Sequence, residues 1–279
     1  MSLVVNSNIA GLNSARSLGK ADRQLTTSVE RLSSGSRINR AADDASGLAI
    51  AEGLRTQIGG LKVALRNTQD GISVLQTAEG ALTETHSVLH RMRDLAVQAA
   101  NDGGLDGGAR AAVQAEIGQL AAELDRIADT TDYSGQRLLD GSYRTTFQVG
   151  ADVGHTIGVD IGTAMSAAGL GVDGLDVTPV TPTVPGTGAS AALTAIDAAI
   201  GRVSTTRAEL GAVQNRFEHN TAKVGAALDN TVAAESRIRD TDLAAEMTTV
   251  SRASILTQAG TAMAAQANQT PRAVLQLLG

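Results

Sequence analysis

Apolar residues recur at intervals of seven along two long stretches of the chain. A sustained repeat of seven is typical of helices that supercoil around partner helices and bury a narrow apolar seam. The first stretch predicts a helix from Asp44 to Ala100, which would be about 85 Å long at 1.5 Å per residue and therefore belongs to a rod rather than a globule. The repeats are Leu54, Leu61, Thr68, Leu75, Leu82, Leu89 and Ala96 in the first stretch, and Ile196, Val203, Leu210, Phe217, Val224, Thr231 and Ile238 in the second.

The region between the two heptad stretches shows three further patterns. Helical spacing over Val113–Ile127 predicts a third helix after a Gly-rich turn at 101–108. Alternating apolar and polar residues predict a β-hairpin near 143–162, and the Gly-, Pro- and Thr-rich segment near 165–190 predicts a short variable loop. The predicted fold is therefore mainly α: a long antiparallel helical coiled-coil rod with discontinuous N- and C-terminal pairing and a small β-hairpin region.

The two heptad stretches can pair antiparallel, which places one charged pair in the seam. If Asp44 lies near Ile238, residues whose numbers total about 284 face each other. Glu79 then faces the neighbourhood of Arg207. We predict that these two form an ion pair that fixes the register, because a polar group in a seam specifies alignment at some cost in stability. The alternative is that both side chains extend to water.

The two ends of the chain carry apolar stripes but almost no charge. No charged residue occurs in 1–15 or in 253–271. Charged groups are depleted at the centres of interfaces, and neither segment can bury its stripe within itself. We predict that the stripes are buried against each other or against copies of the chain, the alternative being an ordinary disordered tail. The residues predicted to serve subunit assembly are Leu18, Leu25, Val29, Leu32, Leu243, Met247, Val250, Leu256, Met263 and Leu275.

Composition narrows the function further. Aromatic residues make up 1% of the chain, so its core must be built from aliphatic side chains on long regular elements. The absence of cysteine excludes disulfides, thiolate metal sites and cysteine nucleophiles. A net charge of −6 argues against nucleic acid as the main partner. The sequence shows neither a signal peptide nor an apolar run long enough to span a membrane, so we expect no membrane insertion.

Candidate catalytic or metal-binding chemistry is sparse. His86 and His90 are four residues apart on the first long helix, but no third ligand is spaced to complete a zinc site. Asp43 and Asp44 are adjacent carboxylates that are better explained as the start of that helix, where negative charge suits the helix dipole. No phosphate-binding loop and no nucleophile with a nearby base is present. We therefore expect no enzymatic activity, no cofactor and no metal.

Four segments resemble bacterial flagellins. They are LSSGSRINRAADDASGLAIAEGLR at 32–55, RNTQDGISVLQTAEGAL at 66–82, LGAVQNRFEHN at 210–220, and the stretch from SRIRDTDLAAEM to the end of QTPRAVLQLL at 236–278. The resemblance implies an inner domain of terminal helices over 1–42 and 240–279 that forms the filament core, and an outer helical domain over 43–239. It also implies an extracellular, motility-driving homopolymer. Its subunits would be exported unfolded by the flagellar type III apparatus with an export chaperone, and would meet filament cap and hook-junction proteins.

One further segment resembles the part of many flagellins that the vertebrate Toll-like receptor for flagellin contacts. It is LHRMRDLAVQAAN at 89–101, and the resemblance implies receptor contacts by Arg91, Leu95 and Glu116. His90 and Asp94 differ from the commoner Gln and Glu. The alternative is that these residues serve packing between subunits.

The sequence leaves two other functions open besides that of a filament subunit. The chain could be a hook–filament junction protein of the same superfamily, or a secreted enzyme on a flagellin scaffold.

Overall fold

The structure is a computed structural model that describes residues 7–101, 104–178 and 187–278, without the side chains of 187 and 270–278. It divides into two compact units, which we call the terminal unit (up to Gln57 and from Asn230) and the second unit (Ile58–Asp229). The elements are α1 (Ile9–Ser34), α2 (Ala45–Ala99), α3 (Gly107–Thr130), β1 (Asp132–Tyr133), β2 (Gln136–Arg137), β3 (Tyr143–Gln148), β4 (Thr156–Ile161), α4 (Ala167–Leu170), α5 (Thr187–Arg239) and α6 (Leu243–Leu278).

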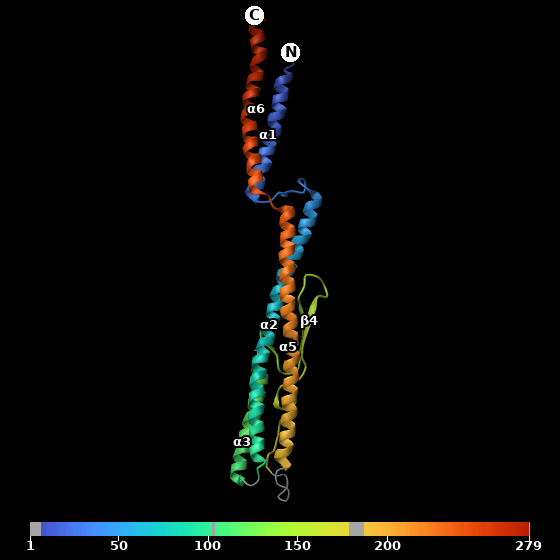
Figure 1. The fold of residues 1–279 in the computed structure, drawn as a ribbon, viewed down its shortest axis with the longest axis vertical. Helices are drawn as coiled ribbons and strands as arrows, with labels where there is room; N and C mark the ends of the chain where they lie inside the picture. Colours follow the sequence, from blue (N-terminus) through green and yellow to red (C-terminus); the bar gives the residue numbers. More distant parts are fainter. Residues whose placement is uncertain (1–6, 102–103, 179–186, 279) are drawn as a thin grey trace. The chain divides into compact units, whose positions relative to one another are not determined.

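The terminal unit pairs α1 with α6 (Figure 1). The pairing is antiparallel, because Asn8 at the start of α1 donates from Nδ2 to the carbonyl of Ala267 near the end of α6, at 2.8 Å. Leu18 packs against Gly260, where a Cβ would lie 3.3 Å from Leu18 Cδ1. Helix α1 ends at Gly35, whose φ of 69° is the left-handed conformation that glycine adopts without strain.

The segments of chain that enter and leave this helix pair are joined by backbone hydrogen bonds. The amide of Arg37 donates to the carbonyl of Arg239 at 2.6 Å, and the amide of Thr241 donates to the carbonyl of Gly35 at 3.0 Å. Ile38, which follows Arg37 in the first of these segments, is buried, with 2% of its surface exposed. The two connections between the helices of the terminal unit are therefore tied to each other rather than loose.

In the second unit α2 runs antiparallel to α5, as the heptads predict. Arg207 contacts Glu79 and Arg93 contacts Asp197, pairs whose residue numbers total 286 and 290. These totals are slightly larger than the predicted total of about 284, so the observed register is shifted by a few residues from the predicted one.

The aliphatic core predicted from the composition is present. Phe217 is the single buried phenylalanine, and its ring packs against Gly71.

The predicted β-hairpin forms from β3 and β4, which pair antiparallel with Tyr143 opposite Ile161 and Gln148 opposite Thr156. It is fastened to both long helices of the second unit. Asn67 of α2 donates to the carbonyl of Gln148 at 3.0 Å, and Asn220 of α5 donates to the carbonyl of Val149 at 2.9 Å. The two-residue strands β1 and β2 form a second, smaller hairpin that the sequence pattern did not predict.

The first part of the predicted variable loop is packed rather than exposed. Helix α4 lies within it, and Gln114 of α3 holds the segment by donating to the carbonyl of Leu175 at 2.7 Å and accepting from the amide of Val177 at 2.8 Å. The side chains of this segment that are fully buried are Met165, Ala167, Leu170, Val172 and Val177. Residues 179–186, which include three of the prolines, lie outside the described residues.

Within the described ranges, no helix combines the length and the apolar character that crossing a membrane requires.

Candidate functional site

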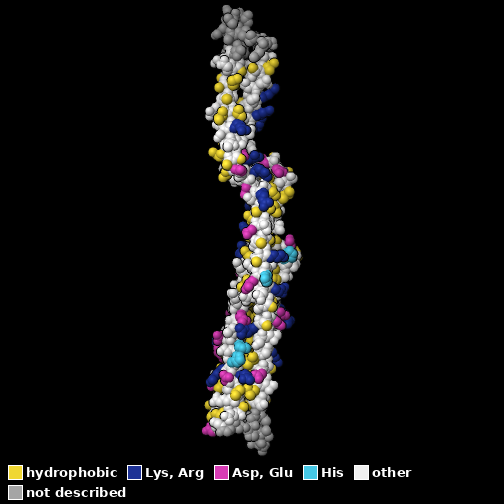
Figure 2. Space-filling view, viewed as in Figure 1, with side chains coloured by type: hydrophobic (Ala, Val, Ile, Leu, Met, Phe, Trp, Pro, Cys, Tyr) yellow, Lys and Arg dark blue, Asp and Glu magenta, His cyan; other side chains and the backbone are white. Residues whose placement is uncertain are grey.

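The α1–α6 pair buries very little of its apolar surface. Among the described side chains of these two helices, only Ala21, Ser28 and Ala253 are buried, with exposed fractions of 8, 3 and 2%. Figure 2 shows hydrophobic side chains at several places along the visible face of this pair. Two-helix pairs of this kind leave one apolar side of each helix in water, which soluble monomers avoid over large contiguous areas.

The residues predicted to serve assembly divide into two groups by exposure. Those that are half-buried are Leu18, Leu25, Leu32 and Val250. Those that are at least half exposed are Val29, Leu243, Met247, Leu256 and Met263, with exposed fractions of 50, 54, 53, 52 and 61%. The side chain of Leu275 lies outside the described residues. We call the exposed group, together with Ile255, the assembly surface.

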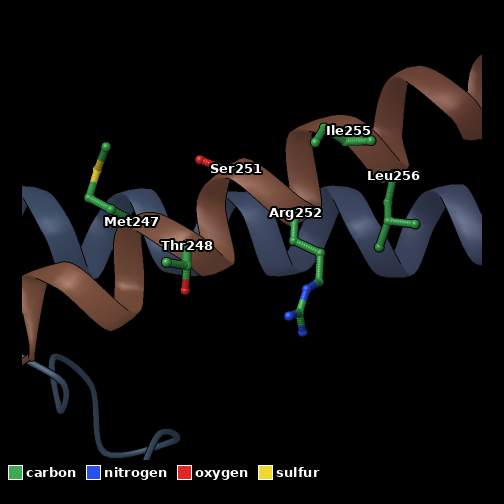
Figure 3. A pocket seen from close by; sticks show the side chains of 6 residues that line it. All are labelled: Met247, Thr248, Ser251, Arg252, Ile255 and Leu256. Atoms are coloured by element: carbon green, nitrogen blue, oxygen red, sulfur yellow. The ribbon is translucent and has the colours of Figure 1, made fainter.

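Ile255 was missed from the sequence, although it is 66% exposed. It lies eight residues after Met247 on α6, so its helical spacing was a usable signal. A shallow hollow on α6 is lined by six side chains of this one helix (Figure 3), which are Met247, Thr248, Ser251, Arg252, Ile255 and Leu256. Three of the six are apolar, and Arg252 is the one charged group.

A second groove runs between the two helices and is lined by both. Its apolar contacts are Leu18 and Ala21 from α1 and Leu256, Ala259 and Met263 from α6. The groove has a volume of about 500 Å³. The two helices therefore offer one continuous region in which a side chain of another molecule would contact both of them.

A polar groove lies between the same helices nearer the connections to the rest of the chain. It is lined by Arg31 from α1 and Glu246 from α6, among others. Arg31 Nε and Glu246 Oε1 are buried and have no hydrogen-bond partner among the described residues. Buried polar atoms are normally paired, so these two atoms are available to a water molecule or to a group of another chain.

In the second unit the structure brings Glu79 and Arg207 together. Arg207 donates from Nε and Nη2 to Glu79 Oε1 at 2.8 and 2.6 Å. The side chains are 38% and 32% exposed, so water still screens the pair.

The three residues predicted to contact the immune receptor do not share one environment. Arg91 and Glu116 form an exposed ion pair at 2.6 Å that joins α2 to α3. Leu95 is only 1% exposed and belongs to the core of the second unit. A buried side chain cannot contact a receptor directly while the unit is folded, so the structure argues against direct contact by Leu95, and contact by Arg91 and Glu116 stays a prediction.

His86 and His90 face each other on α2, with 2.9 Å between their Nε2 atoms. Burial lowers the pKa of His86, and the nearby His90 and Arg207 lower it further. Among the described residues no group of three or more His, Cys, Asp or Glu is placed to hold a metal ion.

Asp43 and Asp44 are helix-start residues in the structure. Asp43 accepts from the amides of Arg40 and Asn39 at 2.9 and 3.1 Å, and Asp44 accepts from the amide of Gly47 at 2.9 Å. These backbone hydrogen bonds hold the pKa of each carboxyl below its usual 3.8.

A mainly α chain whose two ends form an exposed apolar helix pair has the character of a self-associating structural subunit. Comparison with known proteins identifies the family to which this subunit belongs. The family model of the bacterial flagellin N-terminal helical region matches residues 5–144, and that of the C-terminal helical region matches residues 193–278. The chain belongs to the bacterial flagellin family.

Curated relatives agree over the whole length. The chain is 46% identical to a flagellin of Bacillus subtilis (strain 168), with 98% of this chain and 99% of that protein covered. It is 48% identical to a flagellin of Halalkalibacterium halodurans, with 99% and 100% covered. A proposed flagellar hook-associated protein from Vibrio parahaemolyticus has a TM-score of 0.61 at 17% identity over 71% of this chain and all of that one, which shows the fold alone.

The chain is therefore a structural subunit of the bacterial flagellar filament, and it is located outside the cell in that filament. These comparisons do not favour a hook–filament junction protein, because the relatives of high identity are flagellins.

Proposed function

We propose that the assembly surface supplies contacts between subunits in the filament, and that the half-buried Leu18, Leu25, Leu32 and Val250 hold the α1–α6 pair together behind it. The observation that carries this proposal is the exposure of large apolar side chains along both terminal helices of an extracellular structural protein. Burying one such side chain completely is worth about 1.5–3 kcal/mol, so covering the remaining half of each contributes about 1 kcal/mol per residue.

Two further observations support a surface that is completed by other subunits. The buried atoms Arg31 Nε and Glu246 Oε1 have no hydrogen-bond partner among the residues that the structure describes, and a neighbouring subunit would be able to supply one. Three residues of the assembly surface, Ile255, Leu256 and Met263, also lie in 253–271, which contains no charged residue and therefore suits the centre of an interface. A head-to-tail interface of this kind that does not close on itself builds a helical filament.

The test is reassembly of purified monomer, followed by sedimentation and electron microscopy. The double variant Met247→Ser and Leu256→Ser should raise the critical concentration for polymerisation by about thirtyfold, which corresponds to about 2 kcal/mol per subunit. Val63→Ser is the matched control, because Val63 is 45% exposed but lies in the second unit. Filament formation by the double variant at the wild-type critical concentration would rule the proposal out.

We infer the domain layout and the secretion partners from the family. The inner, filament-core domain is proposed to comprise 1–42 and 240–279, and the outer domain 43–239. The compact units have their boundaries inside α2 and α5 instead, at Gln57 and Asn230. Export by the flagellar type III apparatus with a chaperone, and contacts with cap and hook-junction proteins, are proposed on family membership. Secretion of the chain by cells with and without a working export apparatus tests the first of these.

We propose that Arg91 and Glu116 form part of the surface that the vertebrate Toll-like receptor recognises, with packing between subunits as the competing role. Their side chains are 55% and 44% exposed, so they are accessible in the single chain. Arg91→Ala should weaken receptor signalling by monomeric protein in a reporter-cell assay. Arg126→Ala is the control, because Arg126 forms a similar exposed ion pair with Glu123 on α3. Equal signalling by both variants and the wild type would count against the proposal.

The family is one of structural proteins, and we propose that the chain has no catalytic activity of its own. A protease assay with and without a chelator tests this, and chelator-sensitive cleavage would contradict it.

A further inference from the structure

The two histidines on α2 have the spacing of a two-point chelate for a metal ion. Their Nε2 atoms lie 2.9 Å apart and share a hydrogen bond, and the ring centroids lie 4.5 Å apart. Two nitrogen ligands at about 2.0–2.1 Å from one ion, and about 90° apart as seen from it, are themselves about 2.9 Å apart. In departure from the sequence-based expectation of no metal, we propose that His86 and His90 bind one divalent transition-metal ion through their Nε2 atoms, with copper(II) preferred.

The choice of ion follows from the angle and from the number of ligands. Nitrogen ligands at a right angle suit the tetragonal geometry of copper(II) or nickel(II), whereas the tetrahedral geometry of zinc would need the two atoms about 3.4 Å apart. Copper(II) also binds most tightly in the divalent series. Because the described residues offer no third protein ligand, water completes the coordination and the site is open to solvent.

The helix holds the two ligands in place before an ion arrives. His86 and His90 are one turn apart on α2, which is helical from Ala45 to Ala99. Thr85 and Leu89, the residues just before each of them, are both 0% exposed and fix this part of the helix in the core. Binding therefore replaces the hydrogen bond between the two rings and releases its proton, but it requires no ordering of a loop, which favours chelation. His90 is exposed, so an ion can enter from water.

The neighbouring charges do not prevent binding. Arg207 is the cation that acts on His86, but its guanidinium is paired with the Glu79 carboxylate at 2.6 Å. The pair has no net charge, so repulsion of an incoming cation is reduced.

Titration of monomeric protein with copper(II) chloride, followed by calorimetry and electron paramagnetic resonance, tests the proposal. We expect one copper(II) per chain with the signature of two imidazole nitrogens, and weaker binding of zinc(II). His86→Gln and His90→Gln should each weaken binding at least about tenfold, because each leaves one ligand and loses the chelate. His219→Gln is the matched control, since His219 is an exposed histidine on α5 without a second histidine beside it.

Several results would overturn the proposal. One is copper(II) binding by His86→Gln and His90→Gln that equals the wild type, which would assign the ion to another group such as the N-terminal amine. Another is a resonance spectrum with a single nitrogen ligand. His90 is exposed, so His90→Gln leaves the core untouched, and circular dichroism of both variants shows that α2 is retained. The readout does not involve polymerisation, so failure here leaves the proposed assembly surface unaffected.

Discussion

Replacing Gly71 with alanine tests the packing that sets the register of α2 against α5. A Cβ at Gly71 would lie 2.7 Å from Cζ of Phe217, a ring that is 0% exposed and meets Phe147 edge-on with 5.6 Å between centroids. Forcing a methyl group into a packed core costs about 1–3 kcal/mol. Alanine in place of glycine within a helix stabilises the folded protein by about 0.5–1 kcal/mol, which offsets part of that cost. We therefore expect Gly71→Ala to lower the free energy of unfolding by about 1–2 kcal/mol.

A double-mutant cycle with Phe217→Leu isolates the contact. Leucine lacks the outer ring atoms that the new methyl would meet, so in that background Gly71→Ala should be neutral or stabilising by about 0.5–1 kcal/mol. Urea denaturation of the monomer, monitored by circular dichroism, measures the effect of Gly71→Ala on the free energy of unfolding in the wild-type and the Phe217→Leu backgrounds. Gly80→Ala is the control on the same helix, because nothing lies within 4 Å of a Cβ there, and it should stabilise. An equal effect of Gly71→Ala in both backgrounds would refute the contact between Gly71 and Phe217, and with it this register of α2 against α5.

Three further predictions concern the helix ends and the charged pair. Removing all residues after Thr241 should abolish polymerisation while leaving a soluble helical protein. Sedimentation measures the first result and circular dichroism the second. Filaments formed by the truncated chain would contradict the proposed role of α6. The carboxyl of Asp44 has a pKa lowered below 3.8 by the amide of Gly47, so its stabilising contribution is complete above pH 3.8 and is lost as the pH falls through the lowered value. Asp44→Asn keeps the cap but should make stability less sensitive to acid between about pH 2 and 5, and an unchanged pH profile would show that the cap does not titrate with folding. The coupling free energy between Glu79 and Arg207, measured by a double-mutant cycle in urea, should be below about 1 kcal/mol and should decrease in high salt. Both side chains are about one-third exposed, so water and salt screen the pair. A coupling of several kcal/mol would mean that the pair is far better shielded from water than the structure shows.

Much of the fold could be predicted from the sequence because its main determinant is periodic. The heptads ending in Ala96 and beginning at Ile196 identify α2 and α5, and the regularly spaced apolar stripes at the two ends identify α1 and α6. The packing of the segment at 165–178 could not be predicted, because Gln114 holds it at Leu175 and Val177, 61 and 63 residues further along the chain. Contacts over such distances leave no local pattern in the sequence.

The candidate site shows the same division. The spacing of apolar residues predicted the stripes on α1 and α6, but not which members face the partner helix and which face water. Ile255 follows Met247 at helical spacing and was still missed, because it lies one position before the stripe residue Leu256. Leu95 was assigned to a receptor from family resemblance, yet its spacing of six from Leu89 and one from Ala96 places it beside the buried seam. Periodicity would have been the better guide at that position.

Amide hydrogen exchange, measured on dilute monomer and on assembled filament, tests the central claim most directly. Because α1 and α6 bury so few side chains in the single chain, their amides should exchange rapidly in the monomer while those of α2 and α5 in the second unit are protected. In the filament the amides of α1 and α6 should become protected. Strong protection of both terminal helices in the dilute monomer would contradict the claim that they gain their burial from neighbouring subunits.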